Sequence, residues 1–219
     1  SSAEYNNTAK DNAALDAHWA AQKTYDYFKS KHNRNSYDNA GARIKSYVHY
    51  DKSYENAFWN GSVMTYGDGA TRFDALTSLD VGAHEIGHAV CSYTADLVYS
   101  NESGALNEGL SDIWAAAVEY YAAPTKSTWL IGEDIDKQRP SLRSMSNPNA
   151  EGQPDTYKGT YWYSGTGDNG GVHTNSGVIN YWFYILSVGQ SGTNDLGVSF
   201  NVSGIGIDNA AKIVYRMES

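Results

Sequence analysis

His84-Glu85-Ile86-Gly87-His88 is the stretch of this 219-residue chain that decides its fold. Four residues complete about one turn of an α-helix, so both histidines would lie on one helix face. Two imidazoles at this spacing can bind one metal ion, and Glu85 is then placed to take a proton from an attacking water. The five-residue pattern alone also fits two surface histidines on a helix. Other parts of the sequence are needed to distinguish this alternative from a metal site.

A third metal ligand is predicted downstream, in the run Asn107-Glu108-Gly109-Leu110-Ser111-Asp112. Glu108 follows His88 by twenty residues. Two His and one Glu leave the fourth position of a zinc ion to water, as in catalytic rather than structural zinc sites. The alternative pattern H-E-x-x-H-x-x-G-x-x-H is excluded, because Cys91 and Thr94 stand where its Gly and third His would be.

A second helix is predicted from about Ala105 to Tyr121, ending before Pro124. Glu108 and Asp112 are four residues apart on it, so they share one face. Asp112 is therefore expected to accept a hydrogen bond from the second ring nitrogen of a liganding histidine and fix its tautomer. We assign Asn107, beside Glu108, to the same supporting role. A solvated acidic helix face is the simpler alternative.

These motifs resemble, in order and spacing, those of the thermolysin family of secreted zinc metalloproteases. The resemblance extends from about Asp16 to Tyr215. Besides the H-E-x-x-H stretch, it includes Asn56-Ala57-Phe58-Trp59-Asn60-Gly61, Tyr66-Gly67-Asp68-Gly69, Asn101-Glu102-Ser103-Gly104-Ala105, Leu142-Arg143-Ser144-Met145 and Asp168-Asn169-Gly170-Gly171-Val172-His173. Six ordered motifs in register are far more specific than H-E-x-x-H alone.

The resemblance implies roles for three further catalytic residues. His173 and Tyr99 are expected to hydrogen-bond the negative oxygen that develops during peptide hydrolysis, and Asp168 to orient His173. Taken without the family, Asp168 would be an ordinary turn residue, and Tyr99 one of eighteen tyrosines that pack in the protein.

The resemblance also implies how a peptide substrate is bound. Asn56 and Ala57 belong to an expected edge strand that pairs with an extended peptide. Apolar side chains are expected to form the pocket for the residue after the cleaved bond, with Arg143 binding a peptide carbonyl nearby. The pocket residues are Phe73, Leu76, Val81 and Leu142. In most folds these four would simply be core residues.

The predicted function is therefore zinc-dependent endopeptidase activity, with cleavage before hydrophobic residues and Glu85 as the general base. No covalent intermediate is expected. One alternative is a zinc-binding but inactive fragment or pseudoenzyme of this family. Another is a carbohydrate-binding or adhesion module, suggested by 13% aromatic residues and 21 glycines.

Composition excludes several classes of partner. The net charge is −9 and the pI is about 5.0, with no basic run, so neither nucleic acid nor an anionic membrane is expected. No apolar stretch approaches the length of a membrane span. Cys91 is the single cysteine, which excludes an intrachain disulfide; a small buried helix residue is the favoured interpretation. A secreted mature form without signal or pro-segment is implied by the family.

The expected fold class is α+β, with two lobes. We predict a partial N-terminal lobe at 1–78 that contains the substrate strand, and a mainly helical lobe at 79–219 that begins with the zinc helix. Helices are predicted at about 11–30, 176–188 and from 208 onward, with an irregular Gly/Asn/Pro/Ser-rich stretch between 141 and 171. A strand is predicted at 44–50, with Ile44, Tyr47 and Tyr50 in the core, and another at 56–65 broken at Asn60-Gly61.

One structural calcium ion is predicted near the zinc helix. Asp80 lies one turn before His84, and Glu119 lies close to three turns after Glu108, so antiparallel helices would bring both carboxylates to the same side of the zinc. Glu133 could complete a site of hard oxygen ligands. Thr128 and Leu130 stand where thermolysin itself has acidic ligands, so one ion rather than a pair is expected.

The two ends of the chain differ from the family pattern. Thermolysin-like proteases usually have several dozen further residues on each side. The chain is therefore expected to be a core fragment or a nicked piece, with the missing segments as possible separate partners alongside protein or peptide substrates.

Overall fold

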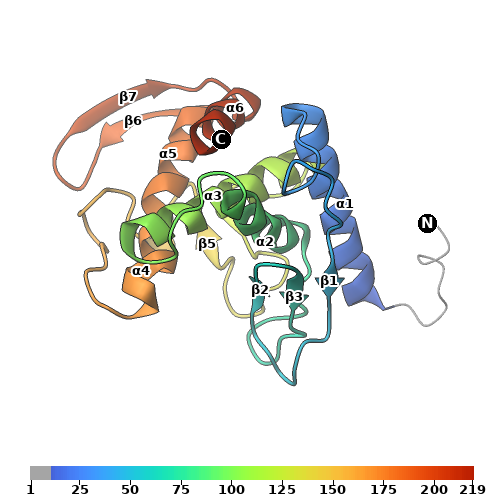
Figure 1. The fold of residues 1–219 in the computed structure, drawn as a ribbon. Helices are drawn as coiled ribbons and strands as arrows, with labels where there is room; N and C mark the ends of the chain where they lie inside the picture. The colour runs from blue at the N-terminus through green and yellow to red at the C-terminus, as the bar shows by residue number, and fades with distance from the viewer. Residues whose placement is uncertain (1–10) are drawn as a thin grey trace.

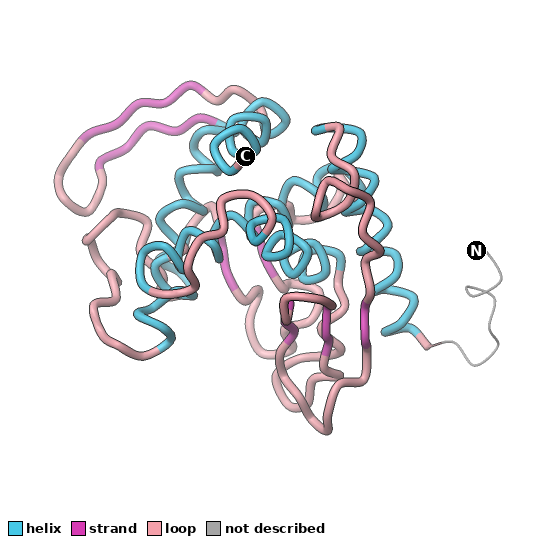
Figure 2. Tube along the Cα trace, in the orientation of Figure 1, coloured by secondary structure: helices cyan, strands magenta, loops and turns pink. Residues whose placement is uncertain are grey.

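The computed structural model describes residues 11–219, which form an α+β fold, as predicted (Figures 1 and 2). Residues 1–10 of the predicted first lobe lie outside this range. The helices are α1 (Asn12–His32), α2 (Leu79–Ser92), α3 (Asn101–Ala122), the 3₁₀ helix η2 (Pro148–Glu151), α4 (Asp168–Asn175), α5 (Gly177–Val188) and α6 (Ile207–Glu218). The strands are β1 (Ser46–Tyr47), β2 (Ala57–Trp59), β3 (Met64–Tyr66), β4 (Leu130–Ile131), β5 (Arg143–Ser144), β6 (Gly189–Thr193) and β7 (Ser199–Ser203).

Helices α2 and α3 form the centre of the molecule, with α1 on one side and α5 on the other (Figure 1). They are antiparallel, since His84 contacts Asp112 whereas His88, one turn further along α2, contacts Asn107. The helices approach closely at Gly87, where a Cβ atom would lie 2.8 Å from the Cα atom of Ser111. A side chain at this point would push the two helices apart.

The hydrophobic core surrounds this helix pair. Trp114 of α3 is fully buried and contacts Phe28 of α1 in an edge-to-face arrangement, with ring centroids 5.0 Å apart. Ile86 and Val90 of α2 are also buried, and α6 adds Val214 to the same cluster. Burying apolar side chains of this size stabilises a fold by about 1.5–3 kcal/mol each. This packing fixes the positions of the helices that carry the predicted metal ligands.

A small sheet packs beside the central helices, with the strand order β1-β3-β2. β2 and β3 form the predicted hairpin, and Asn60 at its turn accepts hydrogen bonds from the backbone of Ser62 and Val63. β1 is shorter than the predicted strand at 44–50 and pairs in parallel with β3. β2 is the edge strand of this sheet.

The prediction that Ile44, Tyr47 and Tyr50 all lie in the core is partly wrong. Ile44 and Val48 pack against the core, but Tyr47 and Tyr50 are exposed. Residues spaced by three alternate between the two faces of a strand, so Ile44 and Tyr47 could not both point inward.

Two elements of the helical half also differ from the prediction. α3 begins at Asn101 rather than about Ala105, and Gly104 lies within it, where a Cβ atom would come within 2.5 Å of a methyl carbon of Val172. The segment after α5 forms an antiparallel hairpin of β6 and β7 that the sequence analysis did not predict. Both strands lie mostly on the surface. β6 contains no apolar residue, whereas β7 does alternate, with the partly buried Phe200 and Val202 between exposed polar residues.

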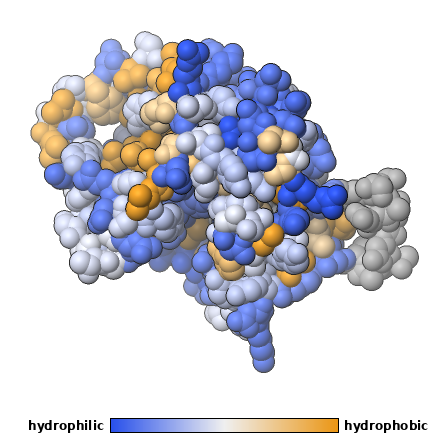
Figure 3. Space-filling model, in the orientation of Figure 1, coloured by the Kyte–Doolittle hydropathy of each residue, from blue (hydrophilic) through white to orange (hydrophobic). Residues whose placement is uncertain are grey.

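The surface is mainly hydrophilic on the face shown in Figure 3, and hydrophobic side chains gather at the upper left, over the hairpin and α5. The exposed apolar residues of the hairpin include Leu196 and Val198. Among residues 11–219, no helix combines the length and apolar character needed to cross a membrane.

One buried carboxyl group couples α6 to the core. Glu218 is 3% exposed and accepts a hydrogen bond of 2.8 Å from the indole of Trp114. Its Oε1 atom has no hydrogen-bond partner within the described part of the chain. Burial raises the pKa of Glu218 to about 7, although the Trp114 hydrogen bond and the Arg34 charge lower it. The folded protein therefore retains a proton that the unfolded chain releases at lower pH.

We expect Glu218→Gln to stabilise the protein at alkaline pH. The Glu218 contribution to stability is fully present below pH of about 4.5 and declines as the pH rises through 7, because the folded state binds the extra proton. The variant should unfold at a higher temperature at pH 8 by the equivalent of roughly 2–3 kcal/mol, with little change at pH 4.5. Thermal unfolding across this range, with Glu102→Gln on the surface as the control, measures the difference. A constant offset at all pH values would contradict it.

Candidate metal centre and active-site cleft

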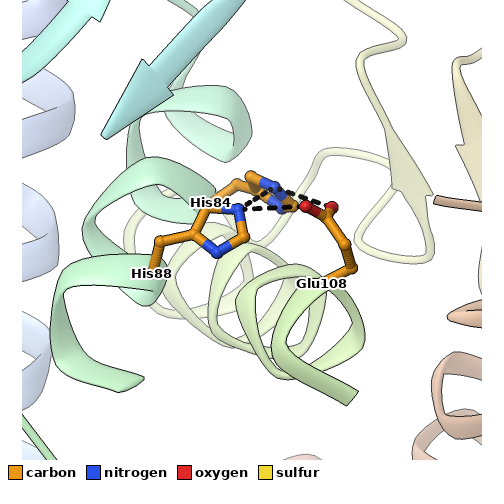
Figure 4. Close-up of side chains that lie close together, drawn as sticks. All are labelled: His84, His88 and Glu108. Carbon is orange, nitrogen blue, oxygen red and sulfur yellow. Dashed lines mark hydrogen bonds and ion pairs between the residues drawn. The ribbon is translucent and has the colours of Figure 1, made fainter. Parts of the chain in front are cut away.

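The three predicted zinc ligands converge at one point between α2 and α3 (Figure 4). His84 and His88 point from α2, and Glu108 points toward them from α3. The Nε2 atoms of the two histidines are 3.0 Å apart. The Glu108 carboxylate lies 3.4 Å from Nε2 of His84, through Oε2, and 3.3 Å from Nε2 of His88, through Oε1.

The two Glu108 separations match those of a tetrahedral zinc ion, and the separation of the two Nε2 atoms is slightly shorter. With bonds of about 2.0–2.1 Å, two ligand atoms of a tetrahedral zinc site lie roughly 3.3–3.4 Å apart. All three donor residues are of the types that bind catalytic zinc, and Glu108 is 1% exposed. Such a buried carboxylate requires positive charge beside it.

The second nitrogen of each histidine is held by α3, as predicted for Asp112 and Asn107. Nδ1 of His84 is 2.8 Å from Asp112 Oδ1, and Nδ1 of His88 is 2.6 Å from Asn107 Oδ1. Ser111, which was not predicted, adds a second contact of 3.1 Å to Nδ1 of His88. Since a carboxylate and an amide oxygen only accept, both Nδ1 atoms carry the proton and both Nε2 atoms face the centre.

The electrostatics of this cluster support a cation at its centre. Burial by itself lowers the pKa of His84, but the hydrogen bond and charge of Asp112, followed by those of Glu108, raise it to about 10. Burial also lowers the pKa of His88, but the charge and the hydrogen bond of Glu108 together outweigh it, so the pKa of His88 is raised. Burial raises the pKa of Glu108, yet the two histidines hold it well below its usual range. The two imidazoles thus take up the positive charge that this carboxylate requires.

His173 and Tyr99 lie beside the same carboxylate. Nε2 of His173 is 3.3 Å from Glu108 Oε1 and 3.2 Å from the Tyr99 hydroxyl, and that hydroxyl also hydrogen-bonds Glu108. Burial and the Glu108 charge raise the pKa of Tyr99, so its hydroxyl keeps its proton. Two donors therefore border the centre.

Asp168 holds His173 in the predicted manner. Its Oδ1 is 2.6 Å from Nδ1 of His173, and its Oδ2 accepts the His173 backbone N–H at 2.9 Å. Residues 168–171 all have positive φ, so the chain makes a tight left-handed turn that returns His173 to Asp168. Gln153 was not predicted: its amide donates to the backbone carbonyl of His173 at 2.7 Å. A glutamine in an irregular loop offers no sequence signal for such a role.

A cleft of about 730 Å³ opens over this centre and is lined by every residue predicted to contact substrate. These residues are Asn56, Ala57, Phe73, Leu76, Val81, Leu142 and Arg143. Glu85, which is 6% exposed, lies in the same cleft beside His84. The edge strand β2 forms one wall, so an extended chain could lie between this strand and the metal ligands.

Arg143 has a second partner that was not predicted. Its Nε and one terminal nitrogen both bond the Asp112 carboxylate, each at 2.7 Å. Burial raises the pKa of Asp112, but the Arg143 charge and the His84 hydrogen bond outweigh this effect and lower the pKa below its usual value. Asp112 therefore stays charged. Arg143 thus joins the wall of the cleft to the support of His84.

The predicted calcium ligands are only partly assembled. Carboxylate oxygens of Glu119, Glu133 and Asp134 lie within 4.8 Å of one another, whereas Asp80 is outside this set. Asp80 instead accepts hydrogen bonds from Ser78 and from the backbone N–H of Gly132. Asp134 was not predicted as a ligand, although it directly follows Glu133.

Cys91 is buried on α2 and forms no disulfide, in agreement with the prediction. Burial raises the pKa of its thiol to about 11. It is not among the residues that line the cleft.

Two family models cover nearly the whole chain. The thermolysin metallopeptidase catalytic domain matches residues 1–92, and the thermolysin metallopeptidase α-helical domain matches residues 95–219. Bacillolysin from Bacillus cereus is 52% identical over 215 residues, which are 96% of this chain and 37% of that protein. Bacillolysin from Brevibacillus brevis is 54% identical over 94% of this chain, and thermolysin from Alicyclobacillus acidocaldarius is 52% identical over the same share.

A solved structure, the precursor of the metalloproteinase protealysin from Serratia proteamaculans, superposes with a TM-score of 0.75 at 37% identity. The superposition covers 83% of this chain and 62% of the protealysin precursor chain. The chain spans somewhat more than a third of the length of the curated relatives it matches. With both family models matched and the His-His-Glu centre assembled, this chain belongs to the thermolysin family of metallopeptidases.

Proposed function

We propose that this chain is a zinc-dependent endopeptidase. The observation that supports it most directly is the convergence of His84, His88 and Glu108 at tetrahedral spacing, with the second nitrogen of each histidine already bonded. This arrangement leaves room for one exogenous ligand in a cleft large enough for a peptide. Zinc held there would polarise a peptide carbonyl and make water a better nucleophile near neutral pH.

The side chains around the centre divide the proton transfer and the charge stabilisation between them. Glu85 would take a proton from the attacking water and deliver it to the leaving amine. His173 and Tyr99 would donate hydrogen bonds to the oxygen that becomes negative. Asp168 would keep the Nδ1 proton of His173 engaged, so that Nε2 faces the reacting group.

Substrates are proposed to be extended peptides with a hydrophobic residue after the cleaved bond. The edge position of β2 supports pairing with a peptide backbone, for which Asn56 and Ala57 would supply contacts. The apolar wall formed by Phe73, Leu76, Val81 and Leu142 supports the side-chain preference. Arg143 would use the nitrogen that Asp112 does not engage to reach a peptide carbonyl.

Two further features are proposed from the family: the division into lobes at 1–78 and 79–219, and secretion. The acidic composition supports the proposal that neither nucleic acid nor an anionic membrane is a partner. The principal rival is a zinc-binding but inactive fragment, and peptide turnover distinguishes it from the enzyme.

Glu85→Gln should retain zinc and lose nearly all hydrolysis, because the amide cannot accept the proton of the attacking water. Cleavage of a blocked peptide and zinc content per chain are measured on the same samples. If the unsubstituted chain binds zinc but does not cleave the peptide, the chain is the inactive fragment. Turnover by the variant at the rate of the unsubstituted chain would refute the role of Glu85.

His173→Ala should lower turnover roughly 10²-fold or more, the usual effect of losing one donor to a developing oxyanion. Zinc content should stay at one per chain, since His173 is not among the three converging ligands. Stopped assays with a blocked peptide, paired with metal analysis, give both quantities. If zinc is lost together with activity, His173 is a ligand and the set of three is wrong.

We also propose one structural calcium ion at Glu119, Glu133 and Asp134. Both carboxylate oxygens of Glu119 and of Glu133 are buried without a hydrogen-bond partner in the described chain. Burial and the neighbouring acidic charges raise the pKa of Glu119 to about 8, and burial with the Asp80 charge raises that of Glu133 to about 7. A hard divalent cation would relieve this repulsion and suit the all-oxygen ligand set.

Calcium should raise the unfolding midpoint at fixed zinc by about 5–10 °C when present at roughly a hundred times its dissociation constant. Glu119→Gln should remove most of this increase, because it takes away the carboxylate at the centre of the cluster. Asp51→Asn, on an exposed loop, serves as the control and should respond like the unsubstituted chain. An equal calcium response in Glu119→Gln would rule out the site.

A further inference from the structure

Asn180 is a fully buried polar side chain near the start of a mainly apolar helix. It belongs to α5, whose sequence is Gly177-Val178-Ile179-Asn180-Tyr181-Trp182-Phe183, and its exposed fraction is 0%. A buried amide is costly unless it is hydrogen-bonded. Its Nδ2 atom donates to Oδ2 of Asp112 at 2.7 Å, whereas its Oδ1 has no partner among the described residues. The helix thus places its one buried amide against the carboxylate that supports His84.

The orientation of this amide is fixed by chemistry. Asp112 is an anion and can only accept, so the NH₂ group of Asn180 must face it. The hydrogen bond therefore stabilises the negative charge. The unpartnered Oδ1 faces away, beside Gly109 of α3, where a Cβ atom would come within 3.3 Å of it. Gly109 allows α5 to approach α3 closely enough for this contact, since the same Cβ would lie 2.0 Å from Ile179.

Asp112 receives four hydrogen bonds, two on each oxygen. Oδ1 accepts from His84 and from a terminal nitrogen of Arg143. Oδ2 accepts from Nε of Arg143 and from Asn180. The donors come from α2, β5 and α5, while Asp112 itself belongs to α3. Because both oxygens are fully engaged, the carboxylate cannot rotate about its Cβ–Cγ bond without breaking several hydrogen bonds.

We propose that Asn180 is a positioning residue of the zinc centre, which acts on His84 by fixing the plane of the Asp112 carboxylate. This inference rests on the proposed zinc site and extends it to a residue outside the motifs. His84 Nδ1 can donate along a lone pair of Oδ1 only while that plane is held, and the direction of this bond sets where Nε2 points. Asn180 is the donor that adds an anchor on Oδ2 from α5, independent of the bonds from Arg143 in the cleft wall.

The position of Asn180 also ties the metal ligand to the oxyanion histidine. Asn180 follows His173 by seven residues, and α4 and α5 are separated by Ser176 alone. Gln153 fastens this joint by donating to the carbonyl of His173 and to the Ser176 hydroxyl. The bond from Asn180 to Asp112 then fastens the start of α5 to α3. The segment that runs from α4 into α5 therefore positions His173 and, through Asn180 and Asp112, supports His84.

The test is the affinity for zinc, measured by competition with a chromophoric chelator, together with the visible absorption spectrum of the cobalt-substituted protein. Asn180→Leu removes the donor with little change of shape. It should weaken zinc binding about 10-fold, the lower end of the range for outer partners of liganding histidines. It should also alter the cobalt spectrum. Phe183→Leu destabilises the same helix without touching Asp112, and its zinc affinity should stay within about twofold of that of the unsubstituted chain.

A double-mutant cycle isolates the route through Asp112. In an Asp112→Asn background, Asn180→Leu should cause little further loss of zinc affinity, because the carboxylate it positions is gone. Asn180→Ala also removes the donor and should weaken zinc at least as much as the leucine variant. It provides the measurement if the leucine variant does not fold.

The outcomes distinguish a failure of the proposed zinc site from a failure of the proposed role of Asn180. Failure of the unsubstituted chain to bind zinc overturns the proposed function and this inference with it. Tight zinc binding by the unsubstituted chain and equally tight binding by the Asn180 variants overturns the inference alone. Additive losses in the double-mutant cycle, or an equal loss in Phe183→Leu, would mean that Asn180 only stabilises helix packing.

Discussion

The burial of two carboxylates between α2 and α3 is the constraint on which the rest of the structure depends. Glu108 and Asp112 are almost completely removed from water, and an unpaired charge in such a place would cost several kcal/mol. Each is therefore surrounded by donors: two histidines and Tyr99 for Glu108, and His84, Arg143 and Asn180 for Asp112. Satisfying these charges fixes side chains from five separate segments, which explains why a cluster of acids organises the fold.

The same constraint explains the spacing of the central helices. Polar atoms on α2 and α3 can meet only if the helix axes are close, and the closest approach occurs where Gly87 faces Ser111. The apolar packing around Trp114 then holds the axes at that distance. Hydrophobic burial thus supplies most of the stabilisation, while the hydrogen bonds select one relative position of the helices. A metal site needs one fixed relative position of the two helices, because its ligand distances tolerate errors of only a few tenths of an ångström.

Helical spacing made a large part of this arrangement predictable. The one-turn separation of His84 and His88, and of Glu108 and Asp112, follows from 3.6 residues per turn. The antiparallel orientation of the two helices was only assumed for the calcium prediction, and the structure shows it. The hairpin turn at Asn60-Gly61 has its own local signal. Contacts between distant segments were not predictable from residues alone: the bond from Asn180 to Asp112 joins residues 68 positions apart. The exposed β6–β7 hairpin was missed although β7 has the apolar alternation of a strand, at Phe200 and Val202; its partner β6 contains no apolar residue.

The difference between the His84–His88–Glu108 centre and the Glu119–Glu133–Asp134 cluster shows how the same residue type acquires different chemistry. Glu108 is surrounded by imidazoles, so its pKa falls and it offers a permanent charge to a metal that prefers nitrogen and oxygen ligands together. Glu119 lies beside further acids, so its pKa rises and it holds a proton unless a cation replaces it. Both carboxylates belong to α3 and are 1% exposed. Burial is therefore common to the two sites, and the neighbouring groups decide which ion each one suits.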